Sequence, residues 1–220
     1  MGASTEPYNR VVPGSFVSHG RYQAWVPAAY EPSRMWPAIL FLHGMGERGN
    51  DGEAQTNVGL GRALRDGKID PPAIAIFPQC PLTTTWTTGA LPIAVAALDE
   101  AMKDYAVDPR RVSLTGISMG GAGAWMLAMT LPRRFSALAP VCGWVPRPHE
   151  KLAQALAGLP IWIFHGSDDP VVPVTESRAM AAILGKNAAY TELPGVQHNS
   201  WDPAYQDTRL VEWLIEQRRR

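Results

Sequence analysis

A serine stands between two glycines in residues 116–120, Gly-Ile-Ser-Met-Gly. A β-prone run (112–115) precedes this stretch and a helix-forming run (122–131) follows it. The pattern therefore predicts a strand, a sharp turn and a helix, with Ser118 at the apex. Such a turn lifts the serine hydroxyl above the sheet and sets the backbone N–H of Met119 at a helix N-terminus, aimed at a developing oxyanion. The alternative is an ordinary Gly-Ser turn or a phosphate-binding loop.

A serine hydroxyl is a weak nucleophile at neutral pH, so it needs an imidazole to accept its proton and an acid to orient that imidazole. His198 lies in the loop after the last predicted strand, and Asp168 and Asp169 follow the strand before it. All three loops are expected at the carboxyl edge of a parallel sheet, where ligands bind. From the residues alone, either aspartate could be the acid.

A second glycine-rich loop, residues 43–49 (His-Gly-Met-Gly-Glu-Arg-Gly), follows the apolar run 38–42. Its glycines let the backbone approach a substrate, and the N–H of Met45 is a candidate second oxyanion donor beside that of Met119. Such a turn also suits a phosphate, but neither the dinucleotide-binding spacing nor the P-loop spacing is present. His43 could be read as a general base, although a histidine just inside a strand end is more often hydrogen-bonded scaffolding.

Short apolar runs alternate with segments of helical periodicity along the chain, which predicts one α/β domain over residues 1–220. The sheet is expected to be mainly parallel, with helices on both faces. A pair of antiparallel strands is expected around Gly20, and residues 1–13 are expected to form a loosely held arm. The predicted buried strands are 38–42, 73–77, 112–115, 135–141, 161–164 and 189–193; the predicted helices are 58–65, 91–106, 122–131, 150–157, 175–184 and 208–218.

Composition argues against several partners. Twenty basic residues balance twenty acidic ones, so nothing indicates a nucleic acid or an anionic membrane as a partner. No apolar run approaches the length of a membrane span and no signal-peptide pattern opens the chain, so we expect a cytoplasmic protein. The sequence carries no indication of oligomeric state.

Four stretches together resemble the α/β-hydrolase fold: residues 116–121, residues 43–49, residues 165–173 (His-Gly-Ser-Asp-Asp-Pro-Val-Val-Pro) and the His198 loop. They are most similar to small esterases of the phospholipase/carboxylesterase and acyl-protein-thioesterase type, and to feruloyl-esterase-like members. In that family the acid is the aspartate of His-Gly-x-x-Asp-x-x-Val-Pro, so the resemblance assigns the acid to Asp169. It also implies Met45 and Met119 as the oxyanion pair.

The resemblance implies a serine esterase that acts on small-molecule carboxylic esters of short-chain or aromatic acids, without a metal or cofactor. Ser118 would attack the ester, His198 would act as base and then acid, and Asp169 would orient His198. The same triad also serves peptidases and acyltransferases, and a non-catalytic binding module on this fold is a further alternative.

Only the short connection 145–160 stands where larger relatives insert a lid domain, so we expect no large lid and an open cleft. Trp86, Trp144 and Trp201 each follow a predicted strand end; they either wall an acyl or aryl pocket or pack against the core. In this fold's strand order, Cys80 and Cys142 stand about three strand spacings, roughly 14 Å, apart, so no disulfide is expected between them.

Overall fold

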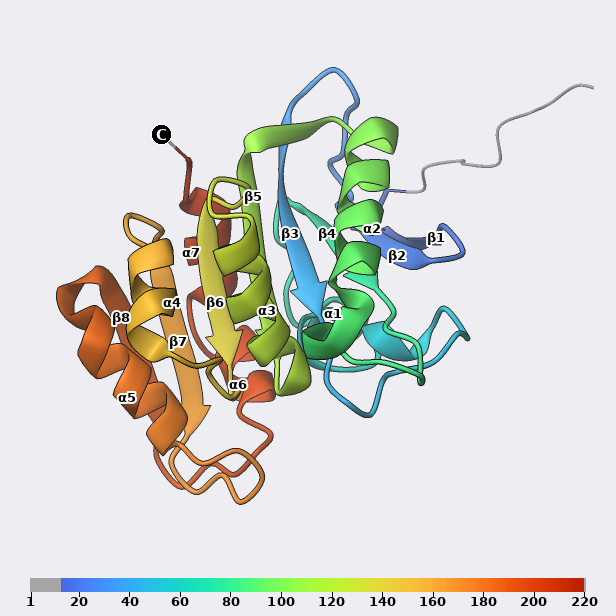
Figure 1. Ribbon diagram of the computed structural model, residues 1–220. Helices are drawn as coiled ribbons and strands as arrows, with labels where there is room; N and C mark the ends of the chain where they lie inside the picture. Colours follow the sequence, from blue (N-terminus) through green and yellow to red (C-terminus); the bar gives the residue numbers. More distant parts are fainter. Residues whose placement is uncertain (1–12, 220) are drawn as a thin grey trace, which may run out of the picture.

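A computed structural model describes residues 13–219 of the chain. Its centre is an eight-stranded sheet with the order β1-β2-β4-β3-β5-β6-β7-β8 (Figure 1). Strands β1 and β2 form the predicted antiparallel pair, β2 runs antiparallel to β4, and every later pairing is parallel. The predicted arm, residues 1–13, lies outside the described residues except for Pro13.

The strands are β1 (Ser15–Ser18), β2 (Tyr22–Val26), β3 (Trp36–Leu42), β4 (Ile74–Pro78), β5 (Val107–Ile117), β6 (Ala137–Val141), β7 (Ile161–Gly166) and β8 (Ala188–Leu193). The helices are α1 (Gly59–Arg65), α2 (Leu91–Asp104), α3 (Met119–Thr130), α4 (His149–Ala155), α5 (Thr175–Leu184), α6 (Trp201–Gln206) and α7 (Leu210–Glu216). Three single turns are also helical: η1 (Ala54–Thr56), the π-helical η2 (Trp86–Ala90) and η3 (Gly185–Asn187).

Two hydrophobic cores lie on the two faces of the sheet, as predicted for a sheet covered on both sides. Helices α2, α3, α4 and α5 pack on one face, and α1, α6 and α7 pack on the other (Figure 1). Strand β3 shows why its sequence is apolar throughout: Leu40 and Leu42 face the first core, whereas Ile39 and Phe41 face the second. Alternate side chains of a strand point to opposite faces, so a strand between two helical layers needs apolar residues at every position.

Apart from the short turns η1, η2 and η3, which were not predicted, one strand and one helix differ from the sequence prediction. Strand β5 begins at Val107 instead of 112, and residues 201–206 form the unpredicted helix α6. Pro203 stands in the first turn of α6, where its missing N–H costs no helical hydrogen bond. Six residues with a proline among them are too few to show helical periodicity, which explains why this helix was missed.

The loops that follow β3, β5, β7 and β8 gather at one edge of the sheet, because parallel strands all end on the same side. This edge is the lower one in Figure 1, where the arrowheads of β3, β6 and β7 point. Strands β3 and β5 separate β4 from β6, which confirms the strand order from which Cys80 and Cys142 were placed apart; both thiols are free and buried. Among the described residues, no helix combines the length and apolarity needed to cross a bilayer.

Candidate active site

Ser118 occupies the sharp turn between β5 and α3. Its backbone has φ 51° and ψ −117°, a conformation that side-chain-bearing residues rarely adopt. The turn brings backbone segments so close that a Cβ added to Gly120 would lie 1.9 Å from the carbonyl oxygen of Leu42. Glycine at 120 is therefore a steric requirement of the turn that presents the serine.

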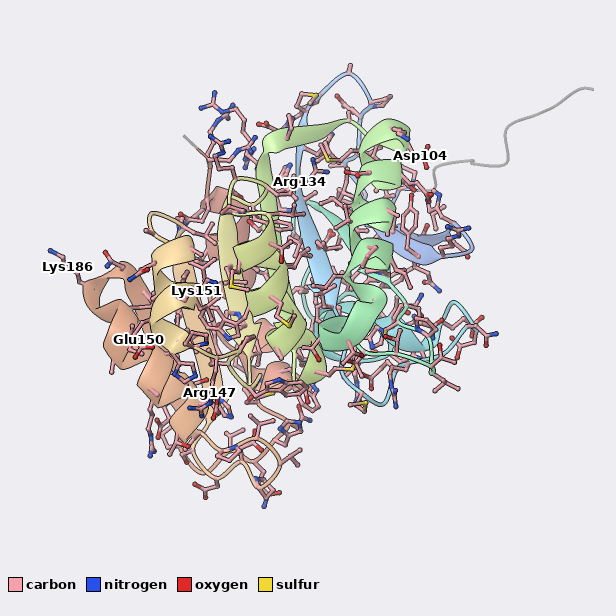
Figure 2. All side chains as sticks on the ribbon, viewed as in Figure 1. Asp104, Arg134, Arg147, Glu150, Lys151 and Lys186 are labelled. Carbon is pink, nitrogen blue, oxygen red and sulfur yellow. The ribbon has the colours of Figure 1, made fainter. Side chains whose placement is uncertain are left out.

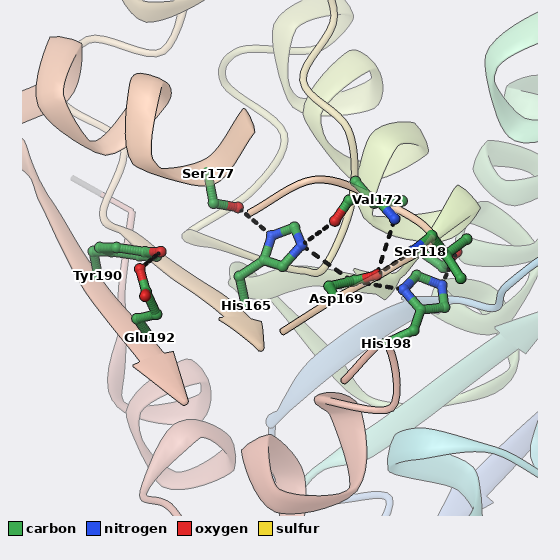
Figure 3. Close-up of polar contacts among 9 residues, drawn as sticks. Ser118, His165, Asp169, Val172, Ser177, Tyr190, Glu192 and His198 are labelled. Atoms are coloured by element: carbon green, nitrogen blue, oxygen red, sulfur yellow. Dashed lines mark hydrogen bonds and ion pairs between the residues drawn. The ribbon is translucent and has the colours of Figure 1, made fainter. Parts of the chain in front are cut away.

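Three side chains form one hydrogen-bonded line at the carboxyl edge of the sheet (Figure 3). The Nε2 of His198 lies 2.9 Å from the Oγ of Ser118, and its Nδ1 lies 2.7 Å from the Oδ2 of Asp169. An ionised carboxylate only accepts hydrogen bonds, so Nδ1 carries the proton and Nε2 is left to accept from the serine hydroxyl. The arrangement suits transfer of the serine proton to His198.

The two adjacent aspartates have different surroundings. The side chain of Asp169 is fully buried, and its Oδ1 accepts hydrogen bonds from the backbone N–H groups of Val171 (2.8 Å) and Val172 (2.9 Å). Asp168 is exposed and accepts a hydrogen bond from Ser167. Burial alone would raise the pKa of the Asp169 carboxyl, but the hydrogen bonds from His198 and the two amides outweigh it and hold that pKa below its usual value. Asp169 is thus the aspartate that meets His198 as an anion.

A pocket of about 250 Å³ opens beside the Ser118 hydroxyl. The backbone of Met45 reaches its rim from the loop after β3, and Met119 begins α3 immediately after the serine. Within residues 13–219, neither N–H donates a hydrogen bond to another protein group. Both donors are therefore left without an acceptor among the described residues. The pocket is lined by Gly44, Met45, Gly46, Glu47, Ile117, Ser118, Val171, His198 and Trp201.

Glu47 also lines this pocket. Burial raises the pKa of its carboxyl, although the backbone amides of Gly44 and Glu47 partly oppose this shift. The loop that carries it is braced from outside, because the guanidinium of Arg48 donates to the carbonyl oxygens of Met45, Leu82 and Thr84. These hydrogen bonds tie the loop beside the serine to the segment after β4.

His43 is scaffolding, and the reading of it as a general base is wrong. Its side chain is fully buried; Nε2 accepts a hydrogen bond from the Cys80 N–H (2.9 Å), and Nδ1 donates to the Gly44 carbonyl (2.7 Å). Burial lowers the pKa of His43 to about 4, so the ring is neutral at physiological pH. It fixes the course of the chain from β3 into the glycine-rich loop.

The three tryptophans have three different positions. The prediction that Trp86 walls the pocket is wrong: its side chain is fully buried in the π-helical turn η2, and its indole N–H donates to the His43 carbonyl (2.9 Å). Trp201 does line the pocket, with its ring edge-on to His198 at a centroid distance of 5.3 Å. Trp144 lies farther out and lines a second, shallower pocket of about 470 Å³.

Val171 lines both pockets, so the second one lies next to the first on the loop after β7. Arg147 stands at its rim, at the same edge of the molecule as the strand ends, whereas Arg134 and Asp104 lie toward the opposite edge (Figure 2). The Arg147 guanidinium is paired with the Glu176 carboxylate at 2.9 Å. A substrate that extends from Ser118 past Val171 would therefore meet an indole, prolines and a neutralised ion pair.

One group of possible metal ligands exists within the described part of the chain. The ligand atoms of Cys142, Asp169 and His198 all lie within 4.8 Å of one another. Asp169 and His198 already hydrogen bond each other, and burial raises the pKa of the Cys142 thiol to about 12. Since metals bind the thiolate and not the thiol, the group at neutral pH is better suited to moving protons than to holding a metal.

Comparison with known proteins adds independent findings. A family profile described as phospholipase/carboxylesterase matches residues 93–210. A crystal structure of a thermostable esterase is 32% identical, with a TM-score of 0.80, over 90% of this chain and 59% of that one. An uncharacterized secreted protein of Arthroderma benhamiae is 28% identical over 86% of this chain but only 24% of its own length. A probable feruloyl esterase C of Aspergillus terreus is 27% identical over 71% of this chain and 57% of that protein. The chain thus spans less than two thirds of each of these proteins.

Proposed function

Because the chain belongs to the phospholipase/carboxylesterase family, we propose that it hydrolyses carboxylic esters of short-chain or aromatic acids through an acyl-enzyme formed on Ser118. Its fold is the α/β-hydrolase fold that the sequence predicts. The observation that carries the proposal is the line of hydrogen bonds from Ser118 through His198 to the buried carboxylate of Asp169, beside an open pocket.

The first half of the reaction forms the acyl-enzyme. The Nε2 of His198 takes the hydroxyl proton as the Oγ of Ser118 attacks the ester carbonyl, and the carbonyl oxygen becomes an oxyanion. The imidazolium that results is stabilised by the Asp169 carboxylate, which already bonds Nδ1. When the tetrahedral intermediate collapses, the alkoxy group leaves and takes the proton from Nε2.

The second half reverses the roles. A water molecule gives a proton to His198 and attacks the acyl carbonyl, and the carboxylic acid leaves as Ser118 recovers its proton. In both halves the N–H groups of Met45 and Met119 would hold the oxyanion, and preorganised donors of this kind are typically worth about 10²–10³-fold each in kcat. Their lack of other acceptors within the described residues supports this assignment.

The size of the pocket supports small acyl groups. A volume of about 250 Å³ suits an acetyl to butyryl chain or a single aromatic ring, and Trp201 provides an aromatic wall. The name of the A. terreus relative, a probable feruloyl esterase, points to hydroxycinnamoyl esters as one aromatic class. A long acyl chain would have to continue over Val171 into the shallow second pocket, which is open to solvent.

A Ser118→Ala variant tests the mechanism, with Ser33→Ala as its matched control because Ser33 lies in an exposed turn away from the site. We expect Ser118→Ala to remain folded and to lose roughly 10⁴-fold or more in kcat on p-nitrophenyl acetate. Ser33→Ala should behave as the wild type. Turnover by Ser118→Ala near the wild-type rate would end the proposal.

The acyl preference is tested separately, with p-nitrophenyl esters from acetyl to palmitoyl and with methyl esters of hydroxycinnamic acids. We expect kcat/KM to be highest for acetyl to butyryl and hydroxycinnamoyl esters and to fall steeply beyond about eight carbons. A maximum at palmitoyl would refute the short-chain assignment while leaving the Ser118 mechanism intact.

A further inference from the structure

His165 is a second buried histidine in contact with the carboxylate of Asp169. It lies at the end of β7, and its side chain is fully buried. The Nε2 atom is 3.2 Å from the Oδ2 of Asp169 and 3.0 Å from the carbonyl oxygen of Val172; the Nδ1 atom is 2.7 Å from the Oγ of Ser177 on α5 (Figure 3). The hydrolytic mechanism above does not use this residue.

The partners of His165 determine where its proton lies. Nε2 faces a carboxylate and a carbonyl, and both can only accept, so Nε2 must carry a hydrogen. Burial lowers the pKa of His165, so the ring is neutral and Nδ1 is an acceptor for the Ser177 hydroxyl. The carboxylate and the carbonyl therefore select the tautomer in which Nε2–H is directed at Asp169, and the Ser177 hydroxyl adapts by donating to Nδ1.

We propose that His165 is a positioning residue for the ester hydrolysis, and that it acts by donating Nε2–H to the same carboxylate oxygen that accepts the Nδ1–H of His198. The proposal rests on the proposed function, since it requires the roles given there to Asp169 and His198. The amides of Val171 and Val172 hold Oδ1, and His165 supplies the second donor to Oδ2. Among the described residues, Oδ2 would then keep a hydrogen bond from His198 alone, whose ring must itself move protons during each cycle.

The charged surroundings set the direction of the expected pH effect. His165 faces Asp169 and His198 from the loops and Glu192 from β8, while α5 contributes the neutral Ser177. Glu192 is tied to Arg178 and Tyr190, so its charge is largely compensated. Cys142, whose Sγ lies within 4.8 Å of a carboxylate oxygen of Asp169, is a protonated thiol. A hydrogen bond from His165 withdraws charge from Oδ2; its removal concentrates that charge and stabilises the protonated His198.

Two amide substitutions separate the two nitrogens of His165. In His165→Asn the side-chain amide can reach the Nδ1 position and Ser177 but not Asp169. In His165→Gln the amide nitrogen can take the place of Nε2 and donate to Asp169. We expect His165→Asn to lower kcat by about 10–100-fold, with KM within about twofold of the wild type, as for other groups that orient an active-site ligand. The acid limb of its pH–rate profile should move to higher pH. His165→Gln should restore most of the kcat and return most of the acid limb to its wild-type position.

Ser177→Ala provides a second test that leaves the histidine in place. It removes the hydrogen bond that holds the ring at Nδ1, so the ring is oriented less firmly and its hydrogen bond to Asp169 is weakened. We expect a loss of several-fold in kcat and a shift of the acid limb in the same direction as for His165→Asn. If His165→Asn fails to fold, as judged by circular dichroism and melting temperature, the kcat and pH profile of Ser177→Ala decide whether His165 has the positioning role.

Three outcomes would overturn the proposal: a wild-type kcat and pH profile in His165→Asn; equal losses in the Asn and Gln variants; or, where Ser177→Ala decides, an unchanged pH profile in that variant. Inclusion of Ser118→Ala in the same series keeps the failures distinct. If Ser118→Ala is inactive while the His165 and Ser177 variants are normal, only the positioning role fails. If Ser118→Ala remains active, the proposed function itself fails.

Discussion

A His-Gly dipeptide directly follows strand β3 and another ends strand β7, at the same edge of the sheet, yet the two histidines hold their protons on opposite nitrogens. His43 carries it on Nδ1, because Nε2 accepts from the Cys80 N–H. His165 carries it on Nε2, because Nε2 faces only acceptors. Both rings are buried, and burial lowers the pKa of both. The local sequence places a neutral imidazole at each strand end, and the neighbours decide what it does.

The difference lies in what each ring bonds. His43 bonds backbone groups only, those of Gly44 and Cys80, so it holds the course of a loop. His165 bonds a carboxylate side chain that itself bonds His198, so it lies one hydrogen bond from the site of proton transfer. We therefore expect changes at the β3 end to appear mainly in stability, and changes at the β7 end mainly in rate and pH dependence.

The largest effect is expected from the carboxylate at the β7 end. Asp169→Asn should lower kcat by about 10⁴-fold, because an amide beside Nδ1 no longer fixes the tautomer of His198 or stabilises its imidazolium. Asp168→Asn is the matched control and should retain wild-type kcat, since the Asp168 side chain is exposed and accepts its hydrogen bond from Ser167. The measurement is kcat on a p-nitrophenyl ester. Should the two variants rank in the opposite order, the acid would have to be reassigned to Asp168.

The next effect concerns the glycines that follow the two histidines. A Cβ on Gly166 would lie 2.2 Å from the carbonyl oxygen of Val196 and 2.4 Å from that of Gln197, in the loop that carries His198. A Cβ on Gly44 meets, at closest, the Glu47 carboxylate at 3.0 Å, which can move. Gly166→Ala should thus displace His198 and cost about 10²-fold in kcat, whereas Gly44→Ala should cost a few-fold. Equal losses would show that the two strand ends are equally constrained.

Much of the fold and of the candidate site is predictable because it depends on local sequence patterns. The turn at Ser118, the loop at Met45 and the alternation of strands and helices each depend on residues close together in the sequence. The choice of Asp169 came from the family pattern, since charge alone does not distinguish two adjacent aspartates. The structure distinguishes them by burial and by the two backbone amides that reach Asp169.

The sequence prediction failed for Trp86 because its contacts join segments that are distant in the chain. Trp86 follows a strand end, as a pocket residue would, but η2 folds it beneath His43 and against α3, where a Cβ on Gly123 would lie 2.5 Å from the Trp86 Cβ. His165 and Asp169 are only four residues apart, yet their contact also went unpredicted, because it requires the loop after β7 to turn back on itself. Packing of this kind has no periodicity for a sequence pattern to reveal.

A smaller, thermodynamic effect is expected at the β3 end. The pKa of His43 is about 4 in the folded protein, against an ordinary value of 6.5. Between these values the unfolded chain binds a proton that the folded chain does not, so the unfolding free energy should fall by up to about 3 kcal/mol as pH drops from 6.5 to 4. His43→Gln keeps an acceptor for the Cys80 N–H but does not titrate, so much of this fall should disappear.

Urea denaturation of the wild type and of His43→Gln at several pH values between 4 and 7.5 measures this directly. The wild type should also show a contribution of the same sign from His165, whose pKa is lowered as well. His165→Gln serves as the comparison and should remove only that part. An identical pH slope in His43→Gln and the wild type would contradict the assignment of a neutral, buried His43.

No effect is expected from reducing agents, which test the two cysteines. Cys80 lies beside His43 and Cys142 beside Asp169, so each strand end has one thiol, and burial raises their pKa values to about 11 and about 12. Reductant should change neither the melting temperature nor kcat, and thiol counting in denaturant should find two free thiols per chain. Finding none in a monomer would mean that the strand order β4-β3-β5-β6 is wrong.

The backbone of Ser118 carries a further consequence, which concerns selection on the sequence. A non-glycine residue at φ 51° and ψ −117° costs of order 1–3 kcal/mol, and glycine at this position would relieve much of that cost. Selection for folding alone would therefore favour Ser118→Gly, and only selection for turnover would retain the serine. In a population released from the need for activity, position 118 should be among the first to change, and the resulting protein should melt at a higher temperature than its ancestor.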